Sequence, residues 1–347
     1  MEIRRMRPDE AKEARSVARK AFGLVEGLFI TKFEDALIAV LDEKIVGGFV
    51  YKISNNGGKK IGFVSFLFIE PSMHGQGIGS RLTKEGIQHL WEEEKCDALV
   101  TFVRDDNVAS WGTFKNNGFV QASLSKIARF AGLLGLIKLY FTTGFYFAIG
   151  HDFYFALKDG ECTVQYKNKG GIWQIVGYVL INILFLAGNI SRIQHVHSFI
   201  AAIAIIFPGM VFAGYIGTLF SNRDKREWKF RFIEGGFIVY MLTNIFGTVF
   251  PLIGGWYPVR YENTPEFKRD MGINAASVWV FLLGLMTASL FIDNLIMEYI
   301  SSVVSILIIL RCLPIPVFYS AGFGRIYSWN KIVFGLLAAA SIYFVLR

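Results

Sequence analysis

The chain has 347 residues, a length that suggests two domains, and 53% of the residues are hydrophobic, which is too apolar for two ordinary soluble domains. The formal net charge is +8, and from residue 171 onward Lys and Arg outnumber Asp and Glu by 13 to 8. A nucleic-acid-binding protein would concentrate its positive charge in a soluble domain, so this distribution argues against nucleic acid as a partner.

Three cysteines, Cys96, Cys162 and Cys312, are widely spaced and odd in number. They suggest neither a disulfide framework nor a cysteine-based zinc site, and they fit a reducing cytosolic environment. We expect no signal peptide, because the first 22 residues are too highly charged for one.

In the first half the hydrophobic pattern is mixed, with strand periods and helix periods in turn. Pro8, Asp9 and Glu10 open the first predicted helix, and 54–58, Ser-Asn-Asn-Gly-Gly, is predicted as a hairpin loop. The predicted strands are 3–6, 36–41, 46–53, 60–69, 98–103 and 151–157, and the predicted helices are about 8–22 and 78–91.

Residues 66–82, FLFIEPSMHGQGIGSRL, have the pattern of a buried strand that enters a glycine-rich turn and then opens a helix. Gly75, Gly77 and Gly79 lack the Cβ atoms that would keep a ligand from the backbone, so N–H groups at the positive helix end can face a pyrophosphate. The order matches neither a dinucleotide fingerprint nor a P-loop. The alternative is that these glycines only make a tight turn.

The order hydrophobic strand, Pro71, His74 and then Gly-x-Gly-Ile-Gly resembles the acetyl-CoA loop of the GNAT superfamily of N-acetyltransferases, with His74 where Arg or Gln is usual. A second segment, 107–119, is similar to the family's Asn-x-x-Ala…Tyr-x-x-x-Gly-Phe pattern, with Ser110 in the Ala place. The resemblance implies an α+β GNAT fold over residues 1–159, a mixed, mostly antiparallel sheet flanked by helices.

The resemblance also implies acetyl-CoA as cosubstrate and no metal. In the family the pantetheine arm pairs with the strand before the glycine turn, as an added strand would. The implied acetyl-CoA contacts are Leu67, Phe68, Ile69, His74, Gly75, Gln76, Gly77, Ile78, Gly79, Ser80 and Asn107.

Attack of an amine on a thioester needs a deprotonated nucleophile, a polarised carbonyl and a proton for the departing thiolate. Glu70 is the candidate base, although a Glu before Pro at a strand end is often simply solvated. The family's frequent thiolate-protonating Tyr maps onto Phe114, which has no proton to give. Either Ser110 or water serves instead, or the domain binds acetyl-CoA without efficient turnover.

Residues 121–150 form an apolar insert between the last two strands, with Lys126, Arg129 and Lys138 interspersed. The insert has the composition of an interfacial helix, whose basic side chains reach lipid headgroups. A helix that covers the domain's own sheet is the equal alternative. Residues 160–170 are predicted to form a polar linker.

Residues 171–347 are predicted to form an all-α polytopic transmembrane domain of about six helices, because apolar runs of 18 or more residues recur. The segment 222–231 carries five Lys or Arg, and the loops around Arg192, Arg260 and Arg325 are poorer in them. The positive-inside rule therefore places the N-terminal domain and the C-terminus on the cytoplasmic side of the cell membrane. The predicted spans are 172–190, 198–220, 232–253, 274–292, 299–318 and 331–346.

Several stretches of 198–347 resemble the site-2 protease family of intramembrane zinc metalloproteases: 207–210, which would lead the second span, 230–236, 271–273, 313–316 and 329–331. Where His-Glu-x-x-His should stand the chain has 213–217, Ala-Gly-Tyr-Ile-Gly, which cannot hold a metal. The resemblance therefore implies a pseudoprotease. Glu234, Asp293 and Arg311 either line its cavity or mark span ends.

These patterns predict a membrane-anchored, acetyl-CoA-dependent N-acetyltransferase that acetylates an amine acceptor on the cytoplasmic side. The alternative is an acetyl-CoA-binding membrane sensor or scaffold with a pseudoprotease domain and little turnover. An active protease is disfavoured by the missing ligands, and a carrier or channel stays open. The expected partners are the lipid bilayer and the amine acceptor, and a membrane-protein partner or a homo-oligomer also stays open.

Overall fold

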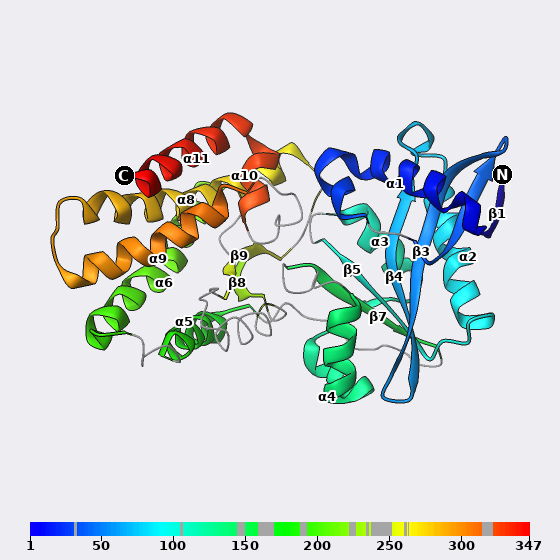
Figure 1. Ribbon diagram of the computed structural model, residues 1–347, viewed down its shortest axis with the longest axis horizontal. Coiled ribbons are helices and arrows are strands. Elements are labelled where there is room, and N and C mark those ends of the chain that lie inside the picture. Colours follow the sequence, from blue (N-terminus) through cyan, green and yellow to red (C-terminus); the bar gives the residue numbers. More distant parts are fainter. Residues whose placement is uncertain are drawn as a thin grey trace. The chain divides into compact units, whose positions relative to one another are not determined.

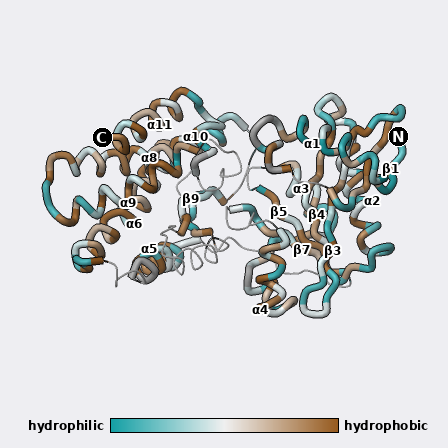
Figure 2. Tube along the Cα trace, in the orientation of Figure 1, coloured by the Kyte–Doolittle hydropathy of each residue, from teal (hydrophilic) through white to brown (hydrophobic). Residues whose placement is uncertain are grey.

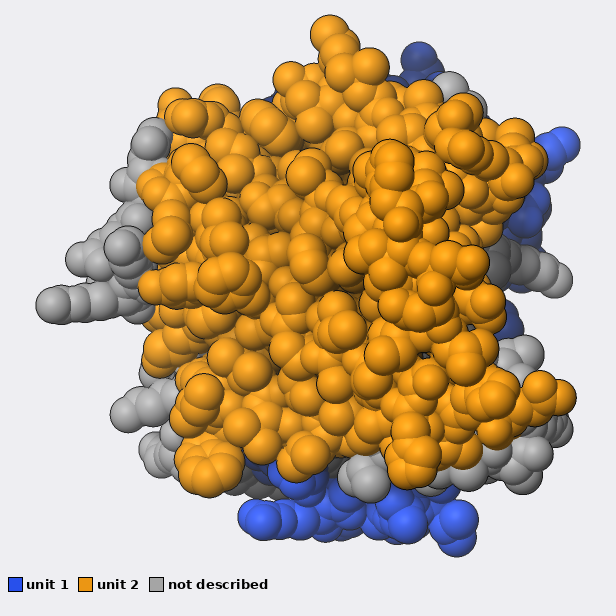
Figure 3. All heavy atoms as spheres, turned by 90° about the vertical axis from the view of Figure 1, so that its left-hand side faces the viewer, with its two compact units in different colours: residues 1–147, 151–166 blue, residues 148–150, 167–347 orange. Residues whose placement is uncertain are grey.

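A computed structural model describes residues 1–30, 33–104, 107–143, 150–158, 170–187, 193–221, 227–233, 236, 252–259, 262, 264–313 and 322–347. The chain divides into two compact units (Figure 3). Unit 1 comprises residues 1–147 and 151–166, and unit 2 comprises 148–150 and 167–347. The predicted linker 160–170 lies outside the described residues except for Gly170.

Unit 1 is built on a seven-stranded sheet in the order β1-β2-β3-β4-β5-β7-β6 (Figure 1). Neighbouring strands are antiparallel except for β4 and β5, which are parallel. The strands are β1 (Glu2–Arg5), β2 (Asp35–Leu41), β3 (Lys44–Asn56), β4 (Lys59–Ile69), β5 (Ala98–Val103), β6 (Val120–Gln121) and β7 (Asp152–Leu157).

Helices cover both faces of this sheet. Along β2, Ala36 and Ile38 pack in the core beside α1 (Ala11–Glu26), whereas Leu37 and Ala39 pack in the core beside α2 (Ile78–Glu92). Alternate side chains of a strand point to opposite faces, which is why a nearly continuous apolar strand feeds two cores. The mixed sheet with helices agrees with the α+β fold predicted for the first half.

The hairpin predicted at 54–58 is present, but its loop is shorter than expected, because β3 continues to Asn56 and only Gly57 and Gly58 remain in the turn. Both glycines have positive φ, 58° and 75°. Two-residue hairpin turns with positive φ at both positions fit the twist of the flanking strands, so the polar run Ser-Asn-Asn pairs in the ladder instead of looping out.

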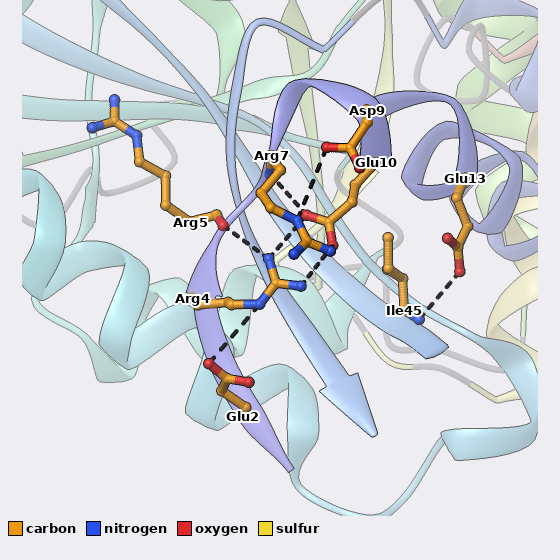
Figure 4. A network of polar contacts seen from close by, with 8 residues as sticks. All are labelled: Glu2, Arg4, Arg5, Arg7, Asp9, Glu10, Glu13 and Ile45. Carbon is orange, nitrogen blue, oxygen red and sulfur yellow. Dashed lines mark hydrogen bonds and ion pairs between the residues drawn. The ribbon is translucent and has the colours of Figure 1, made fainter. Parts of the chain in front are cut away.

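A network of arginines holds Glu10 at the start of the first helix (Figure 4). The Arg4 guanidinium donates to both carboxylate oxygens, at 2.6 and 2.9 Å, and Arg7 donates through its backbone N–H and its side chain, both at 2.8 Å. The hydrogen bonds from Arg4 lower the pKa of Glu10 from its usual 4.5 to about 2. The network therefore fixes β1 to the helix that covers this face.

The apolar insert contains α4 (Leu124–Thr142), a helix kinked at Gly132, where φ is 72°. Phe130 packs edge-to-face on Phe155 of the sheet at 5.2 Å, so one face of α4 covers the unit's own sheet. Leu134 on the other side is 82% exposed. Lys138 Nζ donates to the Asn55 carbonyl at 2.7 Å, which agrees with the alternative that the helix covers the domain's own sheet, and headgroup contact stays a prediction.

The helices of unit 2 are largely hydrophobic along their length (Figure 2), and they pack around a large apolar core, beside which Trp228, Phe267 and Met271 form a smaller cluster. Side-chain hydrogen bonds join its elements: Trp279 Nε1 donates to Ser341 Oγ at 2.8 Å, and Asn274 Nδ2 donates to the Gly214 carbonyl at 2.7 Å. The helices are α5 (Ile172–Ala187), α6 (Val196–Leu219), α8 (Pro265–Ser289), α9 (Leu295–Arg311), α10 (Phe323–Trp329) and α11 (Lys331–Leu346).

Two expectations for unit 2 are wrong. The unit is not all-α, because β8 (Trp228–Phe232) pairs antiparallel with β9 (Gly254–Pro258), and the alternating aromatic residues at 228, 230 and 232 favour a strand over a helix. Arg325 does not lie in a loop, since it is a buried residue of α10.

Three further expectations for unit 2 can be compared with where its helices begin and end. The segment around Pro208 does not lead the second span but lies inside α6, as apolar helices tolerate. The structure also starts α8 at Pro265, nine residues before the predicted span, because Thr264 accepts a capping hydrogen bond from Phe267 N. Arg311 is the last residue of α9.

By length and composition, α6 and α8 are able to cross a bilayer, and α11 is a shorter apolar helix. Most of the third predicted span, 232–253, lies outside the described residues, as do Glu234, residues 222–226 of the basic segment, and residues 314–316 of the protease resemblance. Arg192 and Arg260 also lie outside them. Asp293 is exposed in the turn between α8 and α9.

Candidate active site

The sheet of unit 1 opens between β4 and β5. The two strands pair only from Ile61 with Ala98 to Val64 with Thr101. Beyond that point β5 continues beside β7, while β4 continues beside β3 as far as Ile69 with Gly47. In the described part of the sheet, no strand pairs with the β5-facing edge of β4 after Val64. That edge is a template for another extended chain.

A bulge and a hydroxyl mark the point where the strands part. Val50 faces Phe66 and Tyr51 faces Val64, so Ser65 is an extra residue in β4, and its Oγ donates to the Val50 carbonyl at 3.2 Å. On the other side, Thr101 Oγ1 donates to the Val64 carbonyl at 3.0 Å. A bulge bends and twists its strand, which turns the end of β4 away from β5.

The glycine turn follows the open edge directly. The Glu70 N–H donates to the Val46 carbonyl at 2.9 Å, and a short 3-10 helix, Pro71–Met73, leads to Gly75 and Gly77, with φ of 81° and 74°. A Cβ atom built on either glycine meets nothing within 4 Å, so the space over the turn is open. Both conformations favour glycine.

Gly77 is the N-cap of α2, a helix of 15 residues. The first hydrogen bond of the helix runs from Arg81 N to the Gly77 carbonyl at 3.1 Å. The N–H groups of Ile78, Gly79 and Ser80 therefore have no partner within the helix, and the positive end of the helix dipole lies at the turn. This arrangement fits an anion and requires no basic side chain.

The other predicted contact residues fall around the opening in different ways. Phe68 is buried in the core beside α1, while Leu67 and Ile69 are partly buried and pack toward α2, so the polar groups that these three offer a ligand at the strand edge are those of the backbone. His74 is exposed, and its Nε2 lies 3.2 Å from the Ile69 carbonyl at the strand end. Gln76 Nε2 lies 3.5 Å from Met73 Sδ.

Asn107 and Ser110 lie at the start of α3 (Val108–Asn116), which follows β5. Asn107 is the N-cap of α3, and its Oδ1 accepts a hydrogen bond from Ser110 N at 3.1 Å. The cap fixes the position of this helix start beside the carboxyl end of β5. Ser110 as a whole residue is half-buried.

Glu70, the candidate base, and Phe114, at the position of the family's usual Tyr, differ in their surroundings. Glu70 is half-buried at the carboxyl end of β4, and the described residues give its carboxylate no hydrogen bond. Phe114 is 2% exposed and packs edge-to-face on Phe119 at 5.2 Å, so its ring belongs to the core. Of the two, only Glu70 is open to solvent.

Sequence reasoning missed an ion pair beside the opening. Arg104, which follows β5, contacts the carboxylate of Glu26 at the end of α1, and both side chains are about a quarter exposed, at 24%. Residues 78 positions apart give no sequence signal of such a pair. It joins α1 to the same end of β5 that Asn107 follows.

Other reactive groups of unit 1 lie elsewhere. Burial raises the pKa of the Cys96 thiol to about 11, and Cys96 precedes the amino end of β5, opposite the opening. His89 is buried, with Nε2 2.8 Å from the Tyr51 hydroxyl and Nδ1 3.1 Å from Glu93. Among the described residues, no group of three or more His, Cys, Asp or Glu side chains could hold a metal ion.

Comparison with known proteins identifies the class of this fold. Residues 3–119 match the model of the Acetyltransferase (GNAT) family. This match supports a GNAT acetyltransferase domain in the N-terminal part of the chain, with the glycine turn and the Asn107 cap inside the matched residues.

Two curated relatives are similar over a short stretch. The mycothiol acetyltransferases of Salinispora tropica and Salinispora arenicola are each 31% identical over 67 residues, which cover 19% of this chain and 22% of those proteins. The chain thus spans about a fifth of the length of the curated relatives it matches.

Solved structures of acetyltransferases are also similar. One is a GNAT family acetyltransferase from Brucella melitensis in complex with acetyl-CoA, 23% identical, covering 32% of this chain and 80% of that one, with a TM-score of 0.27. Another is the ribosomal-protein-S18-alanine N-acetyltransferase from Escherichia coli, 18% identical, covering 35% and 79%, with a TM-score of 0.30.

Proposed function

We propose that the chain is a membrane-anchored N-acetyltransferase that moves an acetyl group from acetyl-CoA to an amine on the cytoplasmic side. The observation that carries the proposal is the open edge of β4, which leads into a glycine turn at the amino end of α2 within the residues that match the acetyltransferase family. The acetyl-transfer activity in the names of the curated relatives supports the same reaction.

Different residues around the opening bind different parts of acetyl-CoA. Backbone groups of Leu67, Phe68 and Ile69 pair with the extended pantetheine arm as an added strand would. The N–H groups at the turn, from Gly75 to Ser80, take the pyrophosphate, because they lie at the positive end of α2 and no Cβ blocks them. His74 and Gln76 flank that anion, and Asn107 borders the arm from the β5 side.

For the transfer, the amine attacks the thioester carbonyl, and the carbon–sulfur bond breaks to release CoA as a thiol. Glu70 takes the proton from the attacking amine, directly or through water, because it is the half-buried carboxylate at the end of β4. A backbone N–H near Ile69 polarises the carbonyl. The departing thiolate takes its proton from Ser110 or from water, since Phe114 has none.

Membrane attachment rests on unit 2. Its helices present apolar side chains outward, such as Phe212 on α6 at 65%, Val280 on α8 at 56% and Leu336 on α11 at 67% exposed. Soluble proteins rarely expose apolar surface on several neighbouring helices, whereas a bilayer covers such surface. With the basic segment 222–231 on the cytoplasmic side, the acetyltransferase unit faces the compartment that holds acetyl-CoA.

The proposal is tested by calorimetric titration of acetyl-CoA into the full-length protein in detergent, beside two matched variants. Gly77→Glu places a carboxylate where the pyrophosphate would lie, and Gly58→Glu makes the same change at a glycine of the same φ, 74° against 75°, in the hairpin turn at the other end of β4. Because like charges repel, we expect Gly77→Glu to weaken binding at least about tenfold and Gly58→Glu to leave it unchanged.

Release of free thiol in the presence of an amine panel then measures turnover. The panel contains small amines, peptides with free N-termini and an aminophospholipid. If the two glutamate variants bind acetyl-CoA with equal affinity, the glycine turn is not the acetyl-CoA site. If the wild type does not bind acetyl-CoA at all, the proposed acetyl-transfer reaction is contradicted as well.

An acetyl-CoA sensor is the second candidate function, and the burial of Phe114 favours it. A phenyl ring packed on Phe119 supplies no proton to a thiolate, so a domain of this kind would bind acetyl-CoA and turn it over slowly. Saturable binding without thiol release, for every amine of the panel, is the outcome that separates the sensor from the enzyme.

A further inference from the structure

Unit 1 exposes large apolar side chains along the second half of α4. Leu134 is 82% exposed, and three further apolar residues of the same stretch are also exposed: Leu133, Ile137 and Phe141. At the 3.6-residue period of a helix these positions share one face. The opposite face packs into the unit, because it carries the buried residues Leu136, Leu139 and Tyr140. The second half of α4 is therefore apolar on both faces, although only one face is buried.

A kink at Gly132 separates this half from the first half of α4. The backbone angles of Gly132, φ 72° and ψ 170°, are not helical, and a positive φ favours glycine. Before the kink, Ile127 and Ala131 are buried against the unit, and Arg129 is exposed. After the kink, a Cβ atom built on Gly135 would lie 3.5 Å from Asn56 Cβ at the end of β3. One helix thus follows first the sheet and then the hairpin that extends from it.

The turn of the β3–β4 hairpin lies beside α4 (Figure 1). Lys138 Nζ donates to the Asn55 carbonyl at 2.7 Å. A Cβ atom built on Gly57 would lie 2.6 Å from the Ala131 carbonyl oxygen, so the turn approaches the helix backbone closely. The hairpin turn and the helix therefore form one continuous surface.

The two elements of this surface carry only positive charge. The helix α4 and the hairpin segment 52–60 each contain three Lys or Arg, and neither contains Asp or Glu. Lys59, Arg129 and Lys138 are exposed, whereas Lys60 pairs with Glu94 at 3.3 Å.

The exposed charges lie close to the apolar face. Lys138 follows Leu134 by four residues and precedes Phe141 by three, so its side chain borders that face. Lys59 Nζ lies 6.0 Å from the centroid of the Phe130 ring of α4. A phenyl ring and the carbonyl that Lys138 contacts carry no net charge, so neither neutralises an ammonium group.

This composition fits an anionic lipid surface better than a protein partner. Lys and Arg side chains cover apolar surface with their stems and reach phosphates with their charged ends, while Leu and Phe enter the acyl boundary. The centre of a protein interface is usually depleted of Lys. Large exposed apolar patches on one domain also need a cover, and a bilayer supplies it.

We infer that the surface formed by α4 and the β3–β4 turn docks unit 1 on an anionic lipid bilayer. We call it the α4 surface, and its residues are Leu133, Leu134, Ile137 and Phe141 at the acyl boundary and Lys59, Arg129 and Lys138 at the headgroups. The inference goes beyond attachment through unit 2, because all of these residues belong to unit 1.

Docking leaves the candidate acetyl-CoA site accessible. The hairpin turn precedes Lys59 and the glycine turn follows Ile69, so the two lie at opposite ends of β4. The 11 residues of this strand span about 33 Å. Lipid contact at one end therefore does not cover the other, and the two kinds of binding can be measured separately.

The test places a fluorescent probe on α4 of the full-length protein in lipid nanodiscs. In a variant whose cysteines are replaced by alanine, Leu134→Cys is labelled with a nitrobenzoxadiazole probe. Lys84→Cys, at an exposed position of α2, carries the same probe as the control. The nanodiscs contain phosphatidylcholine with or without phosphatidylglycerol, and a nitroxide-labelled lipid quenches probes that reach the bilayer. Hydrogen–deuterium exchange of α4 in the unlabelled wild type is the second measurement, so the test does not depend on the cysteine variant.

The expected result is lipid contact at position 134 that depends on negative charge in the bilayer. With phosphatidylglycerol present, we expect quenching at 134 to exceed quenching at 84 at least about threefold, and exchange of α4 to slow by a similar factor. Both effects should decrease in pure phosphatidylcholine and at high salt, because salt screens the attraction between exposed lysines and headgroups.

Charge variants locate the contact. Replacing Lys59, Arg129 and Lys138 together by Gln is expected to weaken docking about fivefold for each charge removed. The matched control replaces Lys12, Arg19 and Lys20, exposed residues of α1, by Gln, and it is expected to dock like the wild type. Leu133→Glu places a negative charge on the apolar face and is expected to abolish docking.

Each other outcome overturns the inference. Equal quenching at 134 and 84 with phosphatidylglycerol, or equal docking in the two triple glutamine variants, contradicts a lipid contact of α4. A probe at 134 that is shielded from water but not quenched by lipid shows that unit 2 or a second copy covers the surface.

Failure of the membrane anchor is a separate result. If the full-length protein stays in solution without detergent and does not enter nanodiscs, the proposed anchoring through unit 2 is contradicted. The inference on α4 is then tested by flotation of the same protein with phosphatidylglycerol vesicles. Flotation that the Lys59, Arg129 and Lys138 variant loses supports the inference, and absence of flotation overturns it.

Discussion

The two units use polar groups in different ways. In unit 1 the candidate site consists of backbone groups, at the open edge of β4 and at the first turn of α2. In unit 2 polar side chains join helices to one another, as Trp279 does with Ser341 and Asn274 with the Gly214 carbonyl. A backbone site is encoded in consecutive residues, whereas contacts of side chains depend on how distant elements pack.

The largest effect is expected when a core side chain behind the glycine turn is truncated. Leu82 of α2 is fully buried, at 0% exposure, and Leu82→Ala removes three carbon atoms from the core and leaves a cavity. We expect the unfolding free energy of unit 1 to fall by about 2–5 kcal/mol. Leu134→Ala on α4, where the side chain is 82% exposed, makes the same chemical change and is expected to cost less than about 0.5 kcal/mol.

Scanning calorimetry on the full chain sharpens the comparison between the units. Leu82→Ala is expected to lower the melting temperature of one transition, and Leu282→Ala in α8, also 0% exposed, is expected to lower that of the other. A single transition displaced equally by both variants would show that the two units unfold together.

A smaller effect is expected at the end of β4. Glu70→Gln removes the proposed base and retains the size of the side chain, so we expect thiol release to fall about 100-fold while acetyl-CoA affinity stays within twofold. A stopped assay of free CoA measures the rate of thiol release, and calorimetric titration measures the acetyl-CoA affinity. The control is Glu43→Gln, which makes the same change at an exposed residue of the β2–β3 turn. An equal loss of turnover in this control would contradict the assignment of Glu70 as the base.

The smallest effect is expected from the arginine network at Glu10. Because the pKa of Glu10 is lowered to about 2 in the fold and lies near 4.5 otherwise, its carboxylate stabilises unit 1 fully above about pH 4.5. That stabilisation is lost as the pH falls from 4.5 toward 2.

Urea unfolding at pH 6, 4 and 3 measures this loss. Glu10→Gln is expected to flatten the pH dependence, whereas Asp9→Asn, with a side chain 77% exposed, is expected to preserve it. Equal slopes for Glu10→Gln and the wild type would contradict the role of the network.

Much of unit 1 could be predicted from the sequence because its signals are local. The strand 98–103 was predicted with its observed bounds, and the glycine spacing at 75, 77 and 79 predicted the strand, turn and helix in order. The family match over 3–119 supports the acetyltransferase class that these residues indicated. Whether each predicted contact residue touches acetyl-CoA stays a prediction.

Other features depend on contacts that no local pattern records. The burial of Phe114 follows from its packing on Phe119 within the folded core, and the pair of Glu26 with Arg104 joins residues 78 positions apart. In unit 2, β8 lies mostly within the basic segment 222–231 and β9 follows the predicted span 232–253, so both fell between predicted spans, and α10, which buries Arg325, was assigned to a loop. A single charge in an apolar run has the same appearance whether it ends a span or is buried inside the unit.

The extra residue at Ser65 is a phase shift in the alternation of β4. Val64 packs in the core beside α2, and uninterrupted alternation would place Phe68 in that core as well. Phe68 instead packs in the core beside α1. A one-residue deletion at position 65 would therefore exchange the faces of every side chain from Phe66 to Ile69.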